Sequence, residues 1–278
     1  MSRAPRGLLD AATERLGVAG IDSARVDAEL LLAHCLGLER SRLALVDDVA
    51  DPVAAQFGVL VERRASREPL QYICGRAAFR YLDVLVGPGV FIPRPETELL
   101  VDAVLPFLQT IRAPVVVDLC AGSGVLALAV ADEVPGAQVY GVEHSDAALM
   151  WLRRNAGTKV TVVAGDVLDA RRLLELHGRA DVVVSNPPYV PAATLVEPEV
   201  RADPAEAVFA GDDGLALMPA VIASAGSLLR RGGMLAVEHD TTHGRAVPDL
   251  LRAAGGWGKV ADHVDLAGHP RYATAVRC

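Results

Sequence analysis

Apolar residues recur at helical spacing through the first part of the chain, up to about residue 67. One candidate helix begins at a cap formed by Asp22 or Ser23. Its apolar stripe would consist of Val26, Leu30, Ala33 and Leu36 or Gly37. A second candidate helix begins at Pro52, a residue suited to a first helical turn. Its stripe would consist of Val53, Phe57, Leu60 and Val61. The pattern predicts a small helical bundle over residues 1–68, which either covers the rest of the chain or binds a partner.

The hydrophobic pattern changes over residues 69–95, where short apolar runs alternate with turn-forming residues. The apolar members of this stretch are Phe79, Tyr81, Val84, Val86, Val90 and Phe91. They surround Gly87-Pro88-Gly89, a sequence typical of a turn. We therefore predict a linking β-hairpin that turns at these three residues. A helical segment, Glu96 to Thr110, follows it.

After Pro114, short apolar runs alternate with helical patterns. The runs are Val115–Leu119, Gln138–Val142, Val160–Val163, Asp181–Ser185 and Met234–Glu238. Strands that alternate with helices predict an α/β fold with a doubly wound, mostly parallel sheet. Lys259–His263 and Tyr272–Val276 could add two final strands, and an antiparallel pair would fit there.

Composition and charge narrow the function classes. The chain of 278 residues is 51% hydrophobic and 22% charged, ordinary values for a globular protein with ample material for a core. Its formal net charge is -8. Because proteins that grip nucleic acid through phosphates usually carry a basic face, we expect no direct nucleic-acid binding. An acidic body suits a small cofactor and a protein partner.

Cysteine usage and the N-terminus indicate a reducing compartment. The cysteines are scattered, without metal-binding spacing, at Cys35, Cys74, Cys120 and Cys278. Asp10 and Glu14 interrupt any apolar signal-peptide core. The most apolar stretch, residues 115–131, contains Asp118 and two glycines, so we interpret it as strand, turn and helix rather than a membrane span. We expect a cytoplasmic monomer that does not bind membranes.

A glycine-rich turn, Asp118-Leu119-Cys120-Ala121-Gly122-Ser123-Gly124, follows the first predicted strand of the sheet. Glycines at the carboxyl end of such a strand let the backbone approach a ligand closely. Gly122 to Ala127 also fits the fingerprint of nicotinamide-binding proteins, and a tight turn that binds nothing would look similar. The candidate cofactor-binding residues here are Cys120, Ala121, Gly122, Ser123 and Gly124.

Two acids follow the next two predicted strands. Glu143 lies about 20 residues beyond the glycines, where a carboxylate can accept hydrogen bonds from both ribose hydroxyls of an adenosyl cofactor. Asp166 is placed to accept a hydrogen bond from an adenine amino group, with the backbone of Val167 nearby. Solvated loop acids are the alternative interpretation at both places.

Asn186-Pro187-Pro188-Tyr189 follows the fourth predicted strand of the sheet, and a chance match in such a chain is on the order of one in a thousand. A planar amide nitrogen is a poor nucleophile because its lone pair is delocalised. The Asn186 side-chain oxygen and the Pro187 carbonyl can accept both of its N–H groups and hold it toward a methyl donor. Pro188 helps to stiffen the loop, and Tyr189 can pack on the flat substrate group. We assign Asn186, Pro187 and Tyr189 to catalysis, all four residues to substrate binding, and Asn186 also to the cofactor site.

A further motif, Ile92-Pro93-Arg94-Pro95-Glu96-Thr97-Glu98, is physically a proline-stiffened start of a helix with acids in its first turn. With this motif, the chain resembles the bacterial protein-(glutamine-N5) methyltransferases that act on peptide chain release factors. The resemblance runs through nearly the whole chain. It includes Asp118–Gly124, Ser185–Val190, Glu199–Arg201, Gly211–Leu215 and Arg231–Gly233.

The resemblance implies a class I (Rossmann-like) methyltransferase domain over residues 96–278, linked by the hairpin to a helical domain that helps to hold the release factor. It implies S-adenosyl-L-methionine as cofactor and the glutamine of a Gly-Gly-Gln loop as substrate. Because the sulfonium makes the methyl group electrophilic, positioning does most of the catalysis and no strong base is needed.

This chain departs from the family pattern at three places. Cys120 stands where glycine is usual, and Ala121 where threonine is common. A Cβ at Cys120 would crowd the methionine end of the cofactor. The strand that ends at Glu238 continues as His239-Asp240, where many relatives have a small or apolar residue and then glycine. For His239 and His243 we predict a solvated loop with no metal, because no third ligand is evident.

Three alternatives belong to other classes. An N6-adenine nucleic-acid methyltransferase would also use Asn-Pro-Pro-Tyr, but it needs a basic groove and usually a base-flipping apparatus. A nicotinamide oxidoreductase would leave that motif unexplained. A non-catalytic scaffold conflicts with the presence of both Asn186 and Glu143.

Overall fold

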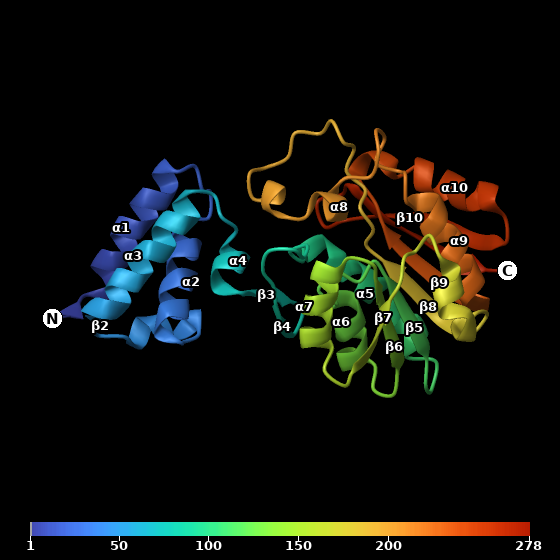
Figure 1. Cartoon of the computed structure of the whole chain (residues 1–278), viewed down its shortest axis with the longest axis horizontal. Coiled ribbons are helices and arrows are strands. Elements are labelled where there is room, and N and C mark those ends of the chain that lie inside the picture. Colours follow the sequence, from blue (N-terminus) through green and yellow to red (C-terminus); the bar gives the residue numbers. More distant parts are fainter. Residues whose placement is uncertain (1) are drawn as a thin grey trace. The chain divides into compact units, whose positions relative to one another are not determined.

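The computed structural model describes residues 2–278, with the side chains of all except Ser2 and residues 170–172. The chain forms two compact units. One comprises the residues up to Arg76 together with Val196–Ala202, and the other comprises Ala77–Leu195 and Asp203–Cys278. We call them the helical unit and the sheet unit, and Figure 1 follows the chain through both.

The helical unit is built on α1 (Pro5–Val18), α2 (Ala24–Leu36) and α3 (Asp51–Ala65). Shorter elements complete it: β1 (Ser2–Arg3), η1 (Arg40–Leu45), β2 (Val49–Ala50), α4 (Leu70–Cys74) and η4 (Val200–Ala202). The three long helices contact one another, and the apolar stripe predicted for α3 is confirmed at its centre because Phe57, Leu60 and Val61 are buried.

The stripe predicted for α2 is wrong at its beginning. Val26 is exposed and Leu30 is only half-buried, whereas Ala28, Leu31 and Leu32 are buried. The physical reason is that α1, α3 and α4 all contact α2, so its buried face is set by three neighbours and not by one apolar row.

The linking hairpin exists, but its predicted turn is wrong. Strands β3 (Arg76–Phe79) and β4 (Leu82–Leu85) form a two-stranded sheet and are joined at Arg80-Tyr81. Arg80 adopts a left-handed φ of 51°. Its guanidinium pairs with Asp102 at 2.7 Å and with Glu133, and these contacts compensate for the strained backbone. The Gly87–Gly89 segment forms a separate turn after the hairpin.

The sheet unit contains a seven-stranded sheet in the order β10-β11-β9-β8-β5-β6-β7. Its strands are β5 (Val115–Leu119), β6 (Gln138–Glu143), β7 (Val160–Ala164), β8 (Ala180–Ser185), β9 (Leu229–Glu238), β10 (Trp257–Val264) and β11 (Pro270–Arg277). β5 to β9 are parallel, while β11 is antiparallel to both β9 and β10. Every predicted strand of the sheet and the antiparallel pair are confirmed. The order reverses at β5, which lies between β6 and β8.

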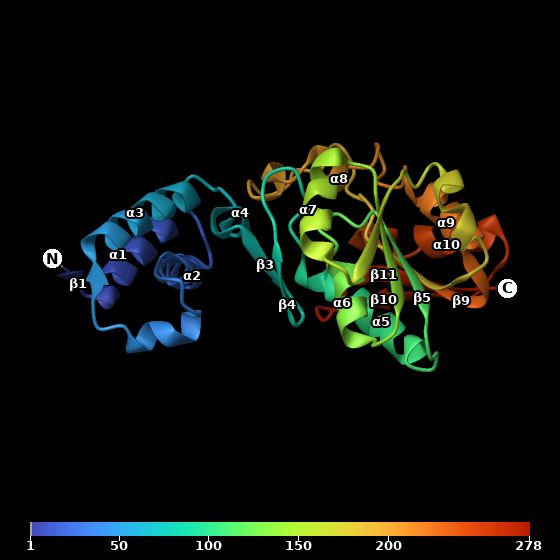
Figure 2. The same ribbon diagram turned by 60° about the horizontal axis from the view of Figure 1, so that its bottom comes forward.

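Helices cover the sheet on both faces, as Figure 2 shows from a second direction. The helical elements of this unit are η2 (Pro95–Thr97), α5 (Glu98–Leu108), α6 (Val125–Glu133), α7 (Asp146–Ala156), η3 (Ala170–Leu176), α8 (Ala205–Val208), α9 (Met218–Leu228), η5 (Thr241–His243) and α10 (Ala246–Ala254). The core under α9 and α10 includes Val183, Leu235, Ile222 and Leu251. Within residues 2–278, no helix combines the length and apolar character needed to cross a membrane.

Candidate active site

The predicted motifs lie along one edge of the sheet because the parallel strands end there together. β5 ends at Leu119, β6 at Glu143, β8 at Ser185 and β9 at Glu238. Ser185 pairs with Leu119 on one side and with Val237 on the other. The loop that starts at Asn186 therefore leaves the sheet between the glycine-rich turn and the end of β9.

The glycine-rich turn reverses direction through left-handed backbone. Cys120, Gly122 and Gly124 have φ values of 63°, 56° and 89°. A Cβ at Gly124 would approach a methyl carbon of Leu152 to 2.5 Å, so glycine is needed there for packing. A Cβ at Gly122 would meet nothing within 4 Å, so this part of the turn faces open space. Cys120 holds its left-handed conformation without the freedom of glycine.

Glu143 is buried against this turn. One carboxylate oxygen accepts the Gly122 N–H at 2.9 Å, and the other accepts the N–H groups of His144 and Ser145 at 2.8 Å each. The oxygen that accepts from His144 and Ser145 has both lone pairs occupied, whereas the oxygen that accepts from Gly122 has one left for a ligand hydroxyl. The structure thus joins two of the predicted cofactor elements, the turn and Glu143.

Asp118 precedes the turn and is buried. Its Oδ2 accepts the Ala127 N–H at 3.1 Å, near the start of α6, while Oδ1 has no hydrogen-bond partner among the described residues. Burial raises the pKa of Asp118 to about 8, and Glu143 adds to this rise, although the Ala127 hydrogen bond opposes it. Asp118 is therefore an acid whose ionisation the fold disfavours.

Asp166 and Val167 follow β7 at the same edge. Asp166 is exposed and accepts the Leu168 N–H at 2.8 Å, while the Val167 carbonyl accepts the Ser224 hydroxyl at 2.7 Å. Both residues border a small cavity of about 10 Å³, room for roughly one water molecule. The cavity is lined by Leu119, Val142, Asp166, Val167, Asp169, Leu173, Ser224 and Leu228.

The Asn-Pro-Pro-Tyr loop is held by side chains from other elements. The Asn186 Nδ2 donates to Thr97 Oγ1 at 3.1 Å, and the Tyr189 hydroxyl donates to Glu238 Oε1 at 2.8 Å. Burial raises the pKa of Tyr189 well above its usual value, and the Glu238 charge adds to the rise. Asn186 is half-buried, and Pro187 is buried beside it. The tyrosine hydroxyl is thus fixed to the protein.

Two later segments of the chain, Val208–Ala210 and Gly211–Leu215, support this loop from outside it. Val190 donates to the Val208 carbonyl and accepts from the Ala210 N–H, both at 3.0 Å. A Cβ at Gly214 would lie 2.2 Å from the Tyr189 carbonyl oxygen, and Gly214 has a φ of 76°. Glycine is therefore required for the Gly211–Leu215 segment to pack against Tyr189.

The proline-rich motif at Ile92–Glu98 is anchored by Asp203. Asp203 is buried, and its carboxylate accepts the Ile92 N–H at 3.0 Å and pairs with Arg94 at 2.5 Å. The Arg94 guanidinium also lies 4.9 Å from the centre of the Phe91 ring. Pro95 then opens η2, as the proline-stiffened helix start predicted.

Three residues that hold these motifs in place were not predicted from the sequence as site residues: Thr97, Asp203 and Glu238. Thr97 lay inside a quoted motif, and Glu238 ended a predicted strand in the same sheet as Asn186. A carboxylate at a strand end was thus the available signal for Glu238. Asp203 carried no signal of its own in the sequence.

The prediction of a solvated loop at His239 and His243 is wrong. Both side chains are buried. His239 Nε2 hydrogen bonds to the Asp262 carboxylate at 2.8 Å, and His243 Nε2 to the Asp213 carbonyl at 2.8 Å. Their partners come from distant segments, so they serve as internal packing residues. Within the described part of the chain, no three potential metal ligands lie together.

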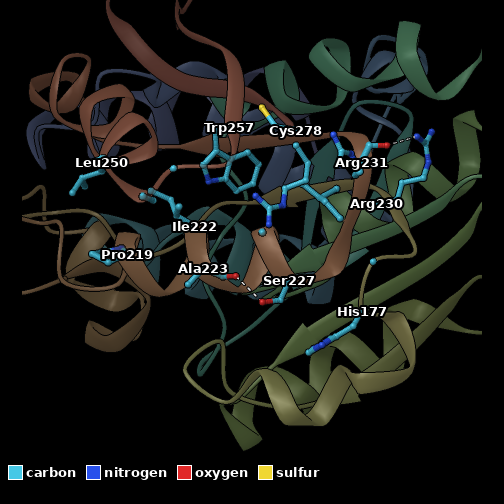
Figure 3. Close-up of a pocket in the computed structure, with 17 residues that line it drawn as sticks. His177, Pro219, Ile222, Ala223, Ser227, Arg230, Arg231, Leu250, Trp257 and Cys278 are labelled. Atoms are coloured by element: carbon cyan, nitrogen blue, oxygen red, sulfur yellow. Dashed lines mark hydrogen bonds between the residues drawn. The ribbon is translucent and has the colours of Figure 1, made fainter.

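A larger hollow, of about 1050 Å³, lies at the other edge of the sheet (Figure 3). Its wall includes Leu229, the first residue of β9, and Trp257, the first residue of β10. Arg230 and Arg231 also border it, and Arg277 packs its guanidinium 5.8 Å from the Trp257 ring. None of the predicted site residues is among those that line it.

Comparisons with known proteins agree with this arrangement. Residues 7–75 match the PrmC N-terminal domain, and residues 82–200 match the methyltransferase small domain. A 16S rRNA N2 methyltransferase from T. thermophilus, solved with AdoMet and guanosine, has a similar fold, with a TM-score of 0.52 and 22% identity. The match covers 73% of this chain and 50% of that one.

Curated relatives match along nearly their whole length. A release factor glutamine methyltransferase from Mycolicibacterium smegmatis is 48% identical over 98% of this chain and 97% of its own. That of Streptomyces coelicolor is also 48% identical, over 95% of both chains. That of Mycobacterium tuberculosis is 44% identical, over 98% of this chain and 91% of its own. The chain therefore belongs to the release factor glutamine methyltransferase family.

Proposed function

We propose that this protein transfers a methyl group from S-adenosyl-L-methionine to the side-chain amide nitrogen of the glutamine in the Gly-Gly-Gln loop of peptide chain release factors. The observation that carries the proposal is the orientation of Asn186. Its amide nitrogen is already engaged by Thr97, which leaves its oxygen as an acceptor for a substrate amide.

The residues at the sheet edge fit an adenosyl cofactor. Glu143 Oε2 has a free lone pair for a ribose hydroxyl, and Asp166 with the Val167 backbone is placed for the adenine. The turn from Cys120 to Gly124 would hold the methionine end, where Gly122 faces open space.

The chemistry needs an oriented amide more than a base. The bound cofactor supplies an electrophilic methyl group on its sulfonium. The Asn186 Oδ1 and the Pro187 carbonyl accept the two N–H groups of the substrate amide and aim its nitrogen. Because the Tyr189 hydroxyl is held by Glu238, the tyrosine offers its ring to the substrate rather than its proton. The surplus amide proton leaves to water after transfer.

Selection of one glutamine requires contacts beyond the Asn-Pro-Pro-Tyr loop, since a glutamine side chain is small and common. We assign this role to the helical unit, which would bind the release factor at a distance from the reacting amide. Docking would also offset part of the entropy of ordering a flexible Gly-Gly-Gln loop. The acidic charge of the chain, -8, supports a protein rather than a nucleic-acid substrate.

The test is mass spectrometry of a purified release factor incubated with the enzyme and labelled S-adenosylmethionine. One methyl group is expected on the Gly-Gly-Gln glutamine, and none on a release factor in which that glutamine is asparagine. DNA and RNA serve as parallel substrates, and label that appears only on their adenines would overturn the substrate assignment. A short Gly-Gly-Gln peptide should react far less efficiently than the whole release factor, and equal efficiency would remove the docking role.

A further inference from the structure

Glu238 is a buried carboxylate that the proposed reaction does not use directly. It ends β9, next to the end of β8 from which Asn186 continues, and only 1% of it is exposed. Its Oε1 accepts the Tyr189 hydroxyl at 2.8 Å. Its Oε2 is buried without a well-formed hydrogen bond to any described residue, although the Thr97 hydroxyl is near enough to lower the pKa of the acid. Such a costly group requires a reason.

Thr97 connects this carboxylate to the candidate catalytic amide. It lies at the end of η2, is 2% exposed, and its Oγ1 accepts the Asn186 Nδ2–H at 3.1 Å. A threonine hydroxyl has a single hydrogen, which it can give to another acceptor. The structure offers it the neighbouring Glu238 carboxylate, whose buried Oε2 has no other partner among the described residues and, when ionised, lone pairs but no hydrogen to give.

The direction of this short chain of hydrogen bonds decides what Asn186 shows to a substrate. With an ionised acid at one end, Thr97 donates toward Glu238 and is left to accept from Asn186. The Asn186 NH₂ group must then face Thr97, and its Oδ1 must face away from it. An asparagine in the opposite orientation would present donors to an amide N–H and repel it.

We propose that Glu238 is a positioning residue that fixes, through Thr97, the amide orientation of Asn186 and so presents its oxygen to the substrate amide. The same carboxylate holds Tyr189 by its hydroxyl, so one acid orients two of the residues assigned to substrate binding. This inference rests on the proposed function, because the acceptor oxygen matters only if the substrate brings an N–H group.

The charge on Glu238 makes the arrangement sensitive to pH. Burial raises the pKa of Glu238 to about 7, the hydroxyls of Thr97 and Tyr189 and the charge of Arg271 lower it, and Glu96 raises it. Below this pKa the neutral acid carries a hydrogen and can donate it to Thr97. The hydrogen bonds between Glu238, Thr97 and Asn186 then no longer run in one fixed direction. The turnover number should therefore fall as the pH falls through about 7.

The first experiment compares the wild type with Glu238→Gln on whole release factor. Glutamine has nearly the same shape, but its NH₂ group can donate to Thr97 and reverse the chain. The turnover number should fall roughly 10- to 100-fold, somewhat less than for complete loss of a preorganised group, with little change in KM or in cofactor affinity. The pH step near 7 should disappear in this variant. Glu206→Gln, at an exposed acid of the same unit, is the matched control.

The second experiment separates orientation from general packing. Thr97→Val should lose turnover as Glu238→Gln does, and Thr97→Ser, which keeps the hydroxyl, should recover most of the loss. In an Asn186→Ala background, Glu238→Gln should cost little more, because both act on the same group. An equal loss in both backgrounds, or a wild-type turnover number for Glu238→Gln, would overturn the proposal.

The orientation can also be measured without any substrate. Nuclear Overhauser contacts should join the Asn186 Nδ2 hydrogens to the Thr97 side chain in the wild type and weaken in Glu238→Gln. Unchanged contacts would overturn the proposal even if activity fell. If the wild type failed to methylate release factors, the proposed function would fail while this measurement still decided the orientation.

Discussion

Replacing Arg64 by alanine should destabilise the helical unit more than any exposed arginine of that unit. The Arg64 side chain is only 8% exposed. Its Nε donates to Asp27 at 2.7 Å, and its Nη1 donates to Glu199 at 2.7 Å. Glu199 belongs to Val196–Ala202, the segment that follows the Asn-Pro-Pro-Tyr loop in the sequence but groups with the helical unit. Arg64 therefore joins α2, α3 and this segment.

The magnitude follows from what the substitution leaves behind. Asp27, whose side chain is 6% exposed, would keep the Ser23 hydroxyl, which donates to it at 2.7 Å, as its one hydrogen-bond donor identified among the described side chains. Breaking a buried ion pair by removing one partner costs about 3–5 kcal/mol. Glu199 is 20% exposed and retains Arg67 at 2.7 Å, so it adds a smaller loss. For a unit of this size, each kcal/mol lowers the melting temperature by about 4–8 °C.

The assay is urea and thermal unfolding of the full chain, followed by circular dichroism. Arg63→Ala is the matched control, because Arg63 pairs with Glu68 at the surface and 43% of its side chain is exposed. It should cost less than about 1 kcal/mol. Asp27→Asn combined with Arg64→Ala should cost less than the two single changes together. If Arg64→Ala and Arg63→Ala unfolded alike, the reasoning from burial would be refuted.

Three shorter predictions concern the sheet edge. Asn186→Ala should lower the turnover number roughly 100- to 1,000-fold, measured by steady-state kinetics, with much less change in cofactor affinity, measured by calorimetry. A turnover number within a few-fold of the wild type would contradict this prediction. Cys120→Gly removes a side chain from a residue with a φ of 63°, so thermal unfolding should show a gain in stability below about 1 kcal/mol. Calorimetry should show tighter cofactor binding, and weaker binding would contradict the crowding attributed to the Cys120 side chain. Because burial raises the pKa of Asp118 in the folded protein to about 8, against about 3.9 for an ordinary aspartate, wild-type stability should decline as the pH rises between these two values. Unfolding of Asp118→Asn should lack that decline, and a parallel pH profile would exclude Asp118 as its source.

The strands and their loops were predictable from the sequence. Strands buried on both faces are continuous apolar runs, so Val115–Leu119 and Asp181–Ser185 stand out without any structure. Because ligand loops of parallel sheets follow the carboxyl ends of strands, Glu143 and Asn186 could be assigned to one edge before their positions were known. The roles assigned to them remain predictions.

Features that depend on contacts between distant segments were not predictable in this way. Val26 was predicted to lie on the buried face of α2 but is exposed, because the helices that surround α2 set that face. The hairpin turns at Arg80 and not at Gly87–Gly89, and Asp102, from a distant segment, pairs with Arg80 there. His239 and His243 looked like loop residues, and their distant partners bury them.

The sequence by itself thus determined where the strands of the sheet end and which candidate site residues follow them, since both depend on local pattern and on the general topology of parallel sheets. The tertiary structure alone brought Thr97 to Asn186, 89 residues apart, and Arg64 to Glu199, 135 residues apart. It also set Glu238 beside Tyr189 through the pairing of β8 with β9. Such contacts depend on strand register and helix packing, which no short stretch of sequence encodes.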